Sequence, residues 1–227
     1  MLVEGFPAQL AGTNCWVVAP GPGEQCLVVD PGVGIGPQLD EIIASNRLHP
    51  VAVLLTHGHL DHTFSAFPVC QAREVPAFIH PSDRRQLADP WWGMGLPFGA
   101  PVFGVEGLTF AEPDDVRELV DESELEIAGL RLRVEHAPGH TSGSVVFATA
   151  DGGAGDAPVM FSGDLLFAGS IGRMDLPGGS ESDMAESLKR VVLPKPDGML
   201  VHSGHGPSTT IGRERRTNPY LREFARE

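Results

Sequence analysis

The chain has 227 residues, of which 41% are hydrophobic and 20% charged, and its formal net charge is −14. This charge disfavours nucleic acid and anionic membranes as partners, because both would repel an acidic protein. No apolar stretch reaches the roughly 20 residues that a membrane-spanning helix needs. We therefore expect no nucleic-acid or membrane partner, and a single domain over residues 1–227, since no Pro/Ser-rich linker interrupts the sequence.

The N-terminus and the cysteines bear on the compartment. The segment Met1–Gly5 has no basic region before an apolar stretch, so we expect a cytoplasmic protein without a secretory signal. Cys15, Cys26 and Cys70 form no close pair, and an odd number of cysteines in a reducing compartment favours free thiols. Cys15 and Cys26 lie in apolar runs and are expected to be buried.

Apolar runs and turn residues predict the secondary structure in chain order. The expected strands are Cys15–Ala19, Cys26–Asp30, Val51–Leu55, Ala77–Ile79, Leu125–Ile127, Leu130–Val134, Ser144–Ala148, Val159–Phe161 and Met199–Val201. A helix over Gln38–Ser45 would bury Leu39, Ile42 and Ile43. Ser180 and Asp183 have the spacing of a capping box that opens a helix through Val192. The tail from Ser208 is expected to be helical and interrupted at Pro219.

Four potential metal ligands lie within six positions behind the apolar run Val51–Leu55, namely His57, His59, Asp61 and His62. In an extended segment, side chains alternate faces, so His57, His59 and Asp61 would point into one cavity and His62 would turn toward it as the chain bends. A histidine-rich surface turn is the alternative, because histidine alone is a weak indicator. Four candidate ligands at this spacing favour a segment that supplies most of a two-metal site.

Three further candidate ligands each follow an apolar strand. They are His140 after Leu130–Val134, Asp164 after Val159–Phe161, and His205 after Met199–Val201. Open sheets bind ligands outside the ends of their strands. We therefore expect these three residues to meet the His57 segment at one edge of the fold.

The candidate ligands lie in motifs that resemble those of the metallo-β-lactamase superfamily, in the same order along residues 14–219. These motifs are His57-x-His59-x-Asp61-His62, Gly139-His140-Thr141, Gly163-Asp164 and Gly204-His205-Gly206. Residues 161–167 and 172–179 are similar to the glyoxalase II-like (hydroxyacylglutathione hydrolase-like) branch. The resemblance implies an α/β fold, a four-layer αββα sandwich with the metals at the open edge of two sheets.

The resemblance also implies a role for each candidate ligand. His57, His59 and His140 would bind one metal, whereas Asp61, His62 and His205 would bind a second, and Asp164 would bridge the two. Imidazole and carboxylate ligands suit zinc best, and iron and manganese accept the same set.

The implied enzyme is a dinuclear metallohydrolase whose nucleophile is a metal-bridging hydroxide, since coordination lowers the pKa of water from about 15.7 to about 7. Asp61 would be the catalytic residue that orients this hydroxide. The implied substrate is a small-molecule acyl thioester. Glutathione as the thiol does not follow, because only a short tail replaces the C-terminal extension that supplies glutathione contacts in true glyoxalase II enzymes.

Three other functions are compatible with the sequence. A persulfide dioxygenase would use one iron bound by His57, His140 and Asp164. A lactonase or β-lactamase would share the hydroxide chemistry and act on a cyclic ester or amide. A non-enzymatic metal-binding module is the third, and a complete open dinuclear set of ligands would be unnecessary for it.

The Gly-rich loop at 172–179 carries Arg173. An ion pair between Arg173 and Asp175 that fixes this loop is slightly favoured over a substrate-binding role for Arg173. The aromatic residues and glycines of Trp91–Phe98, within the long stretch 89–124, suit a lid over the metals or a packing loop equally well.

We favour ordinary structural or surface roles for the histidines outside the motifs and for the arginines of the tail. His136 and His202 lie close enough to ligands in sequence to support them. The remaining residues in this class are His49, His80, Arg213, Arg215 and Arg216. The three arginines are expected on a solvated helix face, and contact with a substrate carboxylate is the alternative.

Overall fold

The computed structural model describes residues 1–149 and 157–224. Two six-stranded sheets dominate this part of the chain. The first sheet has, in spatial order, β1 (Leu2–Pro7), β2 (Asn14–Ala19), β3 (Gln25–Val29), β4 (His49–Leu54), β5 (Ala77–Ile79) and β6 (Val116–Glu118). The second has β12 (Thr209–Thr210), β11 (Leu200–Ser203), β10 (Val159–Gly163), β9 (Val145–Thr149), β8 (Leu130–His136) and β7 (Glu124–Ile127).

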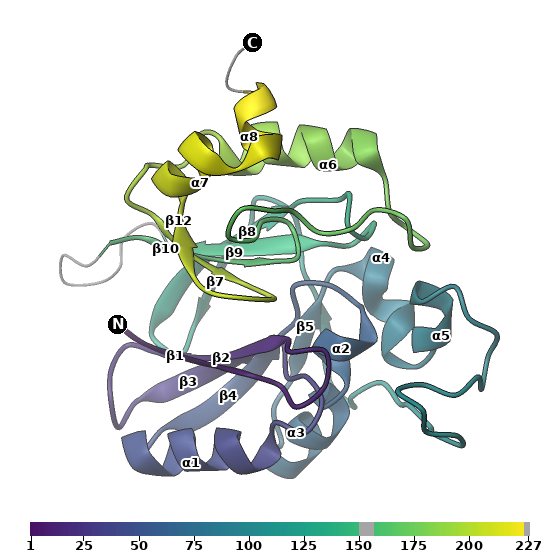
Figure 1. The fold of residues 1–227 in the computed structure, drawn as a ribbon. Coiled ribbons are helices and arrows are strands. Elements are labelled where there is room, and N and C mark those ends of the chain that lie inside the picture. The colour runs from purple at the N-terminus through teal and green to yellow at the C-terminus, as the bar shows by residue number, and fades with distance from the viewer. Residues whose placement is uncertain (150–156, 225–227) are drawn as a thin grey trace.

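Helices cover the outer faces of both sheets and one side of the sandwich. They are α1 (Gly36–Asn46), α2 (Leu60–Thr63), α3 (Ala66–Arg73), α4 (Pro81–Arg84), η1 (Arg85–Leu87), α5 (Pro90–Gly93), α6 (Glu181–Ser187), η2 (Leu188–Val192), α7 (Ile211–Thr217) and α8 (Pro219–Phe224). Figure 1 shows α1 and α3 beyond the first sheet, the two sheets facing each other in the middle, and α6, α7 and α8 beyond the second. The predicted four-layer αββα sandwich is confirmed.

Alternation along the strands divides the apolar side chains among three layers. In β3, Leu27 and Val29 face the second sheet, whereas Val28 packs with Leu39 of α1. In β9, Phe147 faces the first sheet and Val146 packs beneath α6. Because successive strand residues point to opposite faces, each central strand contributes to two cores at once.

The two main covering helices are present, with bounds that differ from the prediction: α1 begins at Gly36 and ends at Asn46, and α6 ends at Ser187, where η2 continues the helical segment to Val192. Proline in the first turn of α1 is compatible with the missing donor there, and Arg47 ends the helix with a left-handed φ of 54°. Leu39 and Ile42 of α1 are buried as predicted, whereas Ile43 is only partly buried. At the start of α6, the Ser180 hydroxyl accepts a hydrogen bond from the Asp183 N–H at 3.3 Å, which confirms the N-cap of the predicted capping box. The Ser180 N–H donates to the Gly139 carbonyl at 2.8 Å, so the reciprocal bond of the box does not form.

Cys15, Cys26 and Cys70 are free thiols, and Cys15 and Cys26 are buried, as predicted; Cys70 is buried as well. Burial raises the pKa of Cys26 to about 11 and that of Cys70 to about 12. These thiols are therefore protonated near neutral pH. Among the described residues, no helix combines the length and hydropathy that crossing a bilayer requires.

Candidate metal centre

The segment after β4 leaves the sheet earlier than the sequence suggested. β4 ends at Leu54, and the Thr56 N–H donates to the Asp30 carboxylate at 2.8 Å instead of continuing a strand ladder. His59 then precedes the one-turn helix α2. Asp61 and His62 therefore lie on a helical turn, and the expectation that strand alternation aims Asp61 into the site was wrong.

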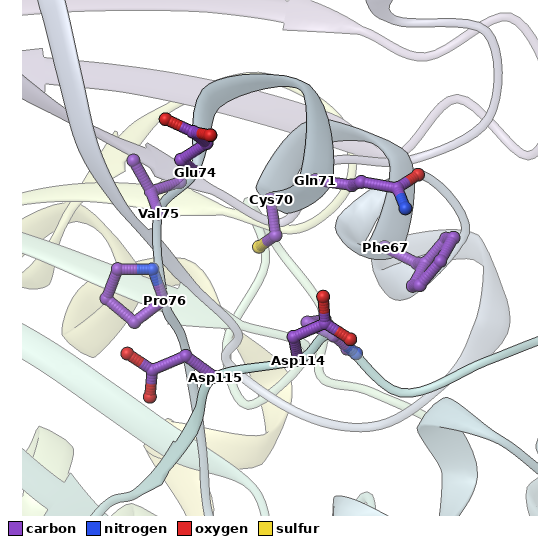
Figure 2. Close-up of a pocket in the computed structure, with 9 residues that line it drawn as sticks. Phe67, Cys70, Gln71, Glu74, Val75, Pro76, Asp114 and Asp115 are labelled. Carbon is purple, nitrogen blue, oxygen red and sulfur yellow. The ribbon is translucent and has the colours of Figure 1, made fainter.

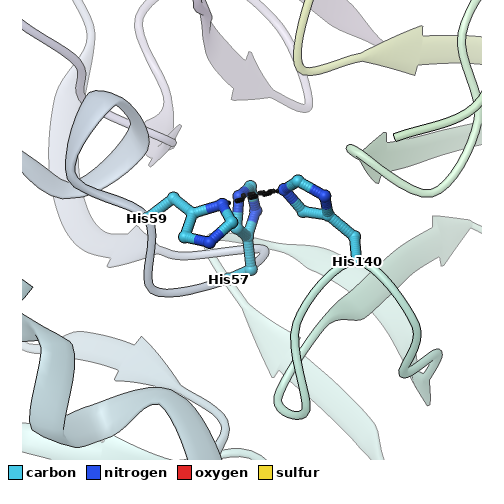
Figure 3. Close-up of side chains that lie close together, drawn as sticks. All are labelled: His57, His59 and His140. Carbon is cyan, nitrogen blue, oxygen red and sulfur yellow. Dashed lines mark hydrogen bonds between the residues drawn. The ribbon is translucent and has the colours of Figure 1, made fainter. Parts of the chain in front are cut away.

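His57, His59 and His140 form the first group of candidate ligands, here called the three-histidine group. Figure 3 shows their rings pointing toward one another, with His57 and His59 on the segment after β4 and His140 on the loop between β8 and β9. His140 Nε2 lies 2.9 Å from His59 Nδ1 and 3.2 Å from His57 Nε2. Ligand nitrogens about 2.0–2.1 Å from a tetrahedral zinc ion are roughly 3.3 Å apart, so this spacing suits one cation.

Asp61, His62 and His205 form the second group, here called the open group. The His205 Nε2 atom lies 3.2 Å from Asp61 Oδ2 and 3.3 Å from His62 Nε2. The side chains of Asp61 and His205 are 22% and 28% exposed, whereas His57, His59 and His140 are at most 6% exposed. One group is therefore enclosed and the other faces solvent.

Asp164 lies between the two groups. Its Oδ2 atom is 3.4 Å from His140 Nε2 and 3.5 Å from His205 Nε2, and its Oδ1 atom is 3.3 Å from His62 Nε2. Oδ1 is buried without a hydrogen-bond partner among the described residues. A buried carboxylate oxygen without a partner is strongly destabilising, so a cation beside Asp164 fits the side chains present.

Burial and neighbouring charges separate the pKa values of the two groups. Burial, aided by other nearby histidines, holds the pKa of His57 well below its usual value and lowers that of His59 to about 3. Burial also disfavours the charged form of His62, but Asp164, Asp61 and Asp30 outweigh it and raise the His62 pKa. His57 and His59 thus keep neutral imidazoles, the form that binds metal.

The carboxylates respond in the opposite sense. Burial alone would raise the pKa of Asp61, but His62 and hydrogen bonds from His205 and Thr13 hold it well below its usual range. His62 likewise outweighs burial at Asp164 and lowers its pKa. Both carboxylates are therefore ionised at neutral pH and available as ligands.

Several groups that hold the ligands in place were missed by the sequence analysis. His62 Nδ1 lies 2.9 Å from Asp30 Oδ2, and His140 Nδ1 lies 2.7 Å from the Arg173 carbonyl oxygen. Such contacts fix which ring nitrogen carries the proton, leaving the other free for a metal. A signal for Asp30 was present, because it follows β3, which pairs in parallel with β4, so both strands end at the same edge.

The beginning of the chain also supports the site. Thr13 donates its hydroxyl to Asp61 Oδ2 at 2.7 Å. The Asn14 N–H donates to the Gly204 carbonyl at 2.6 Å, and the Asn14 amide donates to the Gly206 carbonyl at 2.8 Å. The loop that carries His205 is therefore fastened to the start of β2.

Arg173 and the segment Trp91–Phe98 lie beside the site without entering either group. The Arg173 guanidinium pairs with Asp175 at 2.7 Å and is 60% exposed, so the predicted ion pair forms. Substrate binding by Arg173 stays a prediction. Trp91 is buried and donates to the Ala100 carbonyl at 2.8 Å, whereas Phe98 is 78% exposed. The start of this segment is thus a packing element, and a lid role for its exposed end stays a prediction.

The other histidines and the tail have structural contacts. His136 Nε2 lies 2.9 Å from the Ser142 carbonyl oxygen, and His202 Nδ1 lies 2.8 Å from the Ser208 hydroxyl. Arg215 is not purely solvated as expected, because it donates to the carbonyl oxygens of Leu193 and Lys195 and pairs with Asp197. Arg213 and Arg216 are exposed, as predicted.

A separate cavity of about 310 Å³ lies at the end of α3. Figure 2 shows residues of α3 and of the segment before β6 around it, including Cys70, Glu74 and Asp114. None of the seven candidate ligands lines this cavity. We therefore place the candidate active site at the seven ligands and not at this cavity.

Comparison with known proteins supports this geometry. The sequence profile of the metallo-beta-lactamase superfamily matches residues 9–205. An uncharacterized protein of Mycobacterium tuberculosis is 45% identical over 227 residues, covering 100% of both chains. A probable metallo-hydrolase of Bacillus subtilis, YqgX, is 36% identical and covers 89% of this chain and 90% of its own. The hydroxyacylglutathione hydrolase GloC of Haemophilus influenzae is 34% identical, with 97% and 98% covered.

Two crystal structures share both the fold and part of the sequence. BLEG-1 B3 metallo-beta-lactamase is 34% identical with a TM-score of 0.84, covering 97% of this chain and 99% of its own. The protein TTHA1623, solved in a di-iron-bound form, is 34% identical with a TM-score of 0.77, covering 96% and 100%. The structural likeness therefore spans the whole sandwich and its ligand edge.

Proposed function

This chain belongs to the metallo-beta-lactamase superfamily of metal-dependent hydrolases, and from that membership we propose that it is a dinuclear enzyme that hydrolyses acyl thioesters. The observation that carries the proposal is the position of Asp164 between the three-histidine group and the open group. A carboxylate in that position can serve two cations at once. The di-iron form of TTHA1623 supports a two-metal centre.

The substrate class rests on the branch to which the chain is similar. The relative from Haemophilus influenzae is named a hydroxyacylglutathione hydrolase, and hydroxyacylglutathione is a thioester. Residues 161–167 and 172–179 resemble the same branch. We propose a small acyl thioester as substrate, and the proposal does not specify the thiol.

Bound metals would supply Lewis acidity toward the carbonyl and lower the pKa of water to about 7. The chain's own residues set the geometry for that chemistry. The Arg173 carbonyl and Asp30 hold the Nδ1 atoms of His140 and His62, so that Nε2 of each ring faces Asp164. Asp61, ionised and partly exposed, would orient the attacking water and accept a hydrogen bond from it.

We propose zinc as the physiological metal, because nitrogen and carboxylate ligands in this number suit it. The same set of ligands accepts iron, and the di-iron form of TTHA1623 supports iron as the alternative. Metal analysis of the purified protein is therefore the first measurement. Two divalent cations per chain are expected.

The decisive variant is Asp61→Ala, with Asp40→Ala as a matched control because Asp40 is an exposed carboxylate paired with Arg73. We expect Asp61→Ala to lose most thioester hydrolysis while its circular dichroism spectrum stays that of the parent. The control should retain full turnover. Near-normal hydrolysis by Asp61→Ala with full metal content would contradict the assignment.

Hydrolysis of β-lactams is a second candidate, favoured by the likeness to BLEG-1 B3 metallo-beta-lactamase. Turnover of a thioester, a lactone and a β-lactam on one preparation separates these classes. A β-lactam turned over faster than any thioester would replace the first proposal. One iron per chain with oxygen uptake on a persulfide would replace both.

A further inference from the structure

Asp83 is a buried carboxylate that neither ligand group contains. It lies on α4, outside the two sheets, and its exposed fraction is 0%. A buried carboxylate needs hydrogen-bond donors to remain stable in the fold. The donors that Asp83 uses come from two loops, and both loops carry candidate ligands.

The carboxylate connects the segment after β4 to the loop between β8 and β9. Its Oδ2 atom accepts hydrogen bonds from the Gly58 N–H at 2.8 Å and from the Thr141 hydroxyl at 2.6 Å. Its Oδ1 atom accepts one from the Gly143 N–H at 2.9 Å. Gly58 lies between His57 and His59, and Thr141 follows His140. Asp83 therefore contacts both segments that carry the three-histidine group.

Two glycines make this close approach possible. A Cβ atom at Gly143 would lie 2.5 Å from Asp83 Cγ, and one at Gly58 would lie 2.9 Å from the Asp83 carbonyl oxygen and 2.7 Å from Gln86 Nε2. These separations are too short for any side chain. Each loop therefore lacks a side chain at the point where the α4 segment meets it.

We propose that Asp83 is a positioning residue that fixes the separation of the two histidine-bearing loops and thereby sets the metal affinity of the three-histidine group. The metal-binding role of these histidines rests on the proposed function. The separation matters because His57 and His59 follow a strand of the first sheet, whereas His140 follows a strand of the second. Ligand nitrogens displaced by a fraction of an ångström no longer match the coordination sphere of one cation.

The test compares Asp83→Asn with Glu214→Gln. An amide at position 83 keeps the size of the side chain. Its NH₂ group, however, must face at least one of the three groups that donate to Asp83, so at least one hydrogen bond is lost. Glu214 is the matched control, because it is also 0% exposed and accepts from Thr209, Gly169 and Asn218, none of which lies in the loops of the three-histidine group. Both variants are expected to lower the unfolding temperature.

Zinc affinity separates a positioning role from a merely structural one. In competition with a chromophoric chelator, Asp83→Asn should bind one zinc ion about 10–100-fold more weakly, the usual range for groups that support metal ligands. Glu214→Gln should bind both ions as the parent does. Parent-like zinc affinity in a folded Asp83→Asn protein would overturn the proposal.

A second variant and a metal-free measurement cover a failure of Asp83→Asn to fold. Thr141→Val removes one of the three hydrogen bonds, and it should weaken one zinc ion in the same direction by a smaller factor. Amide hydrogen exchange at Gly58 and Gly143 in metal-free protein should speed up in either variant. Unchanged exchange and zinc affinity in Thr141→Val would overturn the proposal, whereas a parent protein that binds fewer than two zinc ions would contradict the proposed function instead.

Discussion

The two halves of the metal centre differ in enclosure and in charge. The three-histidine group is at most 6% exposed and consists of imidazoles only, whereas the open group contains a carboxylate and has side chains that are 22% and 28% exposed. Water and substrate can therefore reach the centre from the open group. This difference fits the proposed two-metal centre, in which the enclosed half would hold a cation firmly and the open half would exchange ligands during turnover.

The largest effect is expected from Asp164→Asn, because it removes the connection between the two halves. An amide cannot supply negative charge to both cations, so we expect the variant to lose one of them. The loss of one cation is expected to remove several kcal/mol of stabilisation of the transition state. We expect a roughly 10³-fold loss of kcat for thioester hydrolysis. Steady-state kinetics with parallel metal analysis measures it.

The control for Asp164→Asn is Asp175→Asn, which changes an exposed carboxylate that pairs with Arg173. Its turnover should stay within a factor of about two of the parent. Parent-like kcat in Asp164→Asn would show that the two halves act independently. That result would end the dinuclear interpretation.

A smaller effect is expected from Asp30→Asn, which should affect one half of the centre and leave the other unchanged. Asp30 accepts from His62 Nδ1, so its loss should weaken the metal of the open group about 10–100-fold. The three-histidine group should keep its metal in a stepwise chelator titration. Equal weakening of both metals would contradict the division into two halves.

Thr56→Val is the companion to Asp30→Asn, because Thr56 also donates to Asp30 and lies 3.1 Å from His57 Nδ1. If Thr56→Val alone reproduces the loss at the open group, the effect of Asp30 passes through Thr56. Retention of that metal in Thr56→Val assigns the effect to His62. Both variants use the same titration.

The smallest effect concerns His80, which stacks on His136 at 4.1 Å without any ligand geometry and so contrasts with both halves. Burial and the nearby His136 lower the pKa of His80 from 6.5 to about 4. Between these values the unfolded chain binds a proton that the folded chain does not, so stability falls as the pH falls from 6.5 toward 4. Solvent screening limits the effect to less than about 1 kcal/mol.

His80→Asn removes this titration and keeps a side chain that can cap α4, as the His80 ring does through the Ser82 N–H. The variant should lose less stability than the parent between pH 7 and pH 5 in urea unfolding. His49→Asn, at an exposed position, should follow the parent. Identical pH dependence in His80→Asn and the parent would contradict the prediction.

The layers of the fold could be predicted because each central strand carries its own pattern. Leu27, Val28 and Val29 are apolar on both faces, as a strand between two cores requires. β1 was missed because Gly5 and Pro7 interrupt its apolar pattern, and the Trp16 ring lies where a side chain at position 5 would be. β6 has only three residues, of which two are exposed.

The candidate ligands could be found because each follows a strand or lies in a dense motif. Most of the groups that hold them could not, because their partners are distant in the chain and their residue types are common. Asp30 could have been suspected, since it follows a strand that ends at the same edge, but Asp83 lies on helix α4 and meets Gly143 across 60 positions. No local pattern marks an aspartate that will accept hydrogen bonds from a distant loop.

The contacts of Thr13 and Asn14 have a consequence for biosynthesis. They bind Asp61 and the loop at 204–206, so the start of the chain meets a segment made 192 residues later. During translation the N-terminal part emerges first and begins to fold while the last ligand is still unmade. The open group can therefore be completed only once His205 has been synthesised, and the proposed second ion would bind after that point.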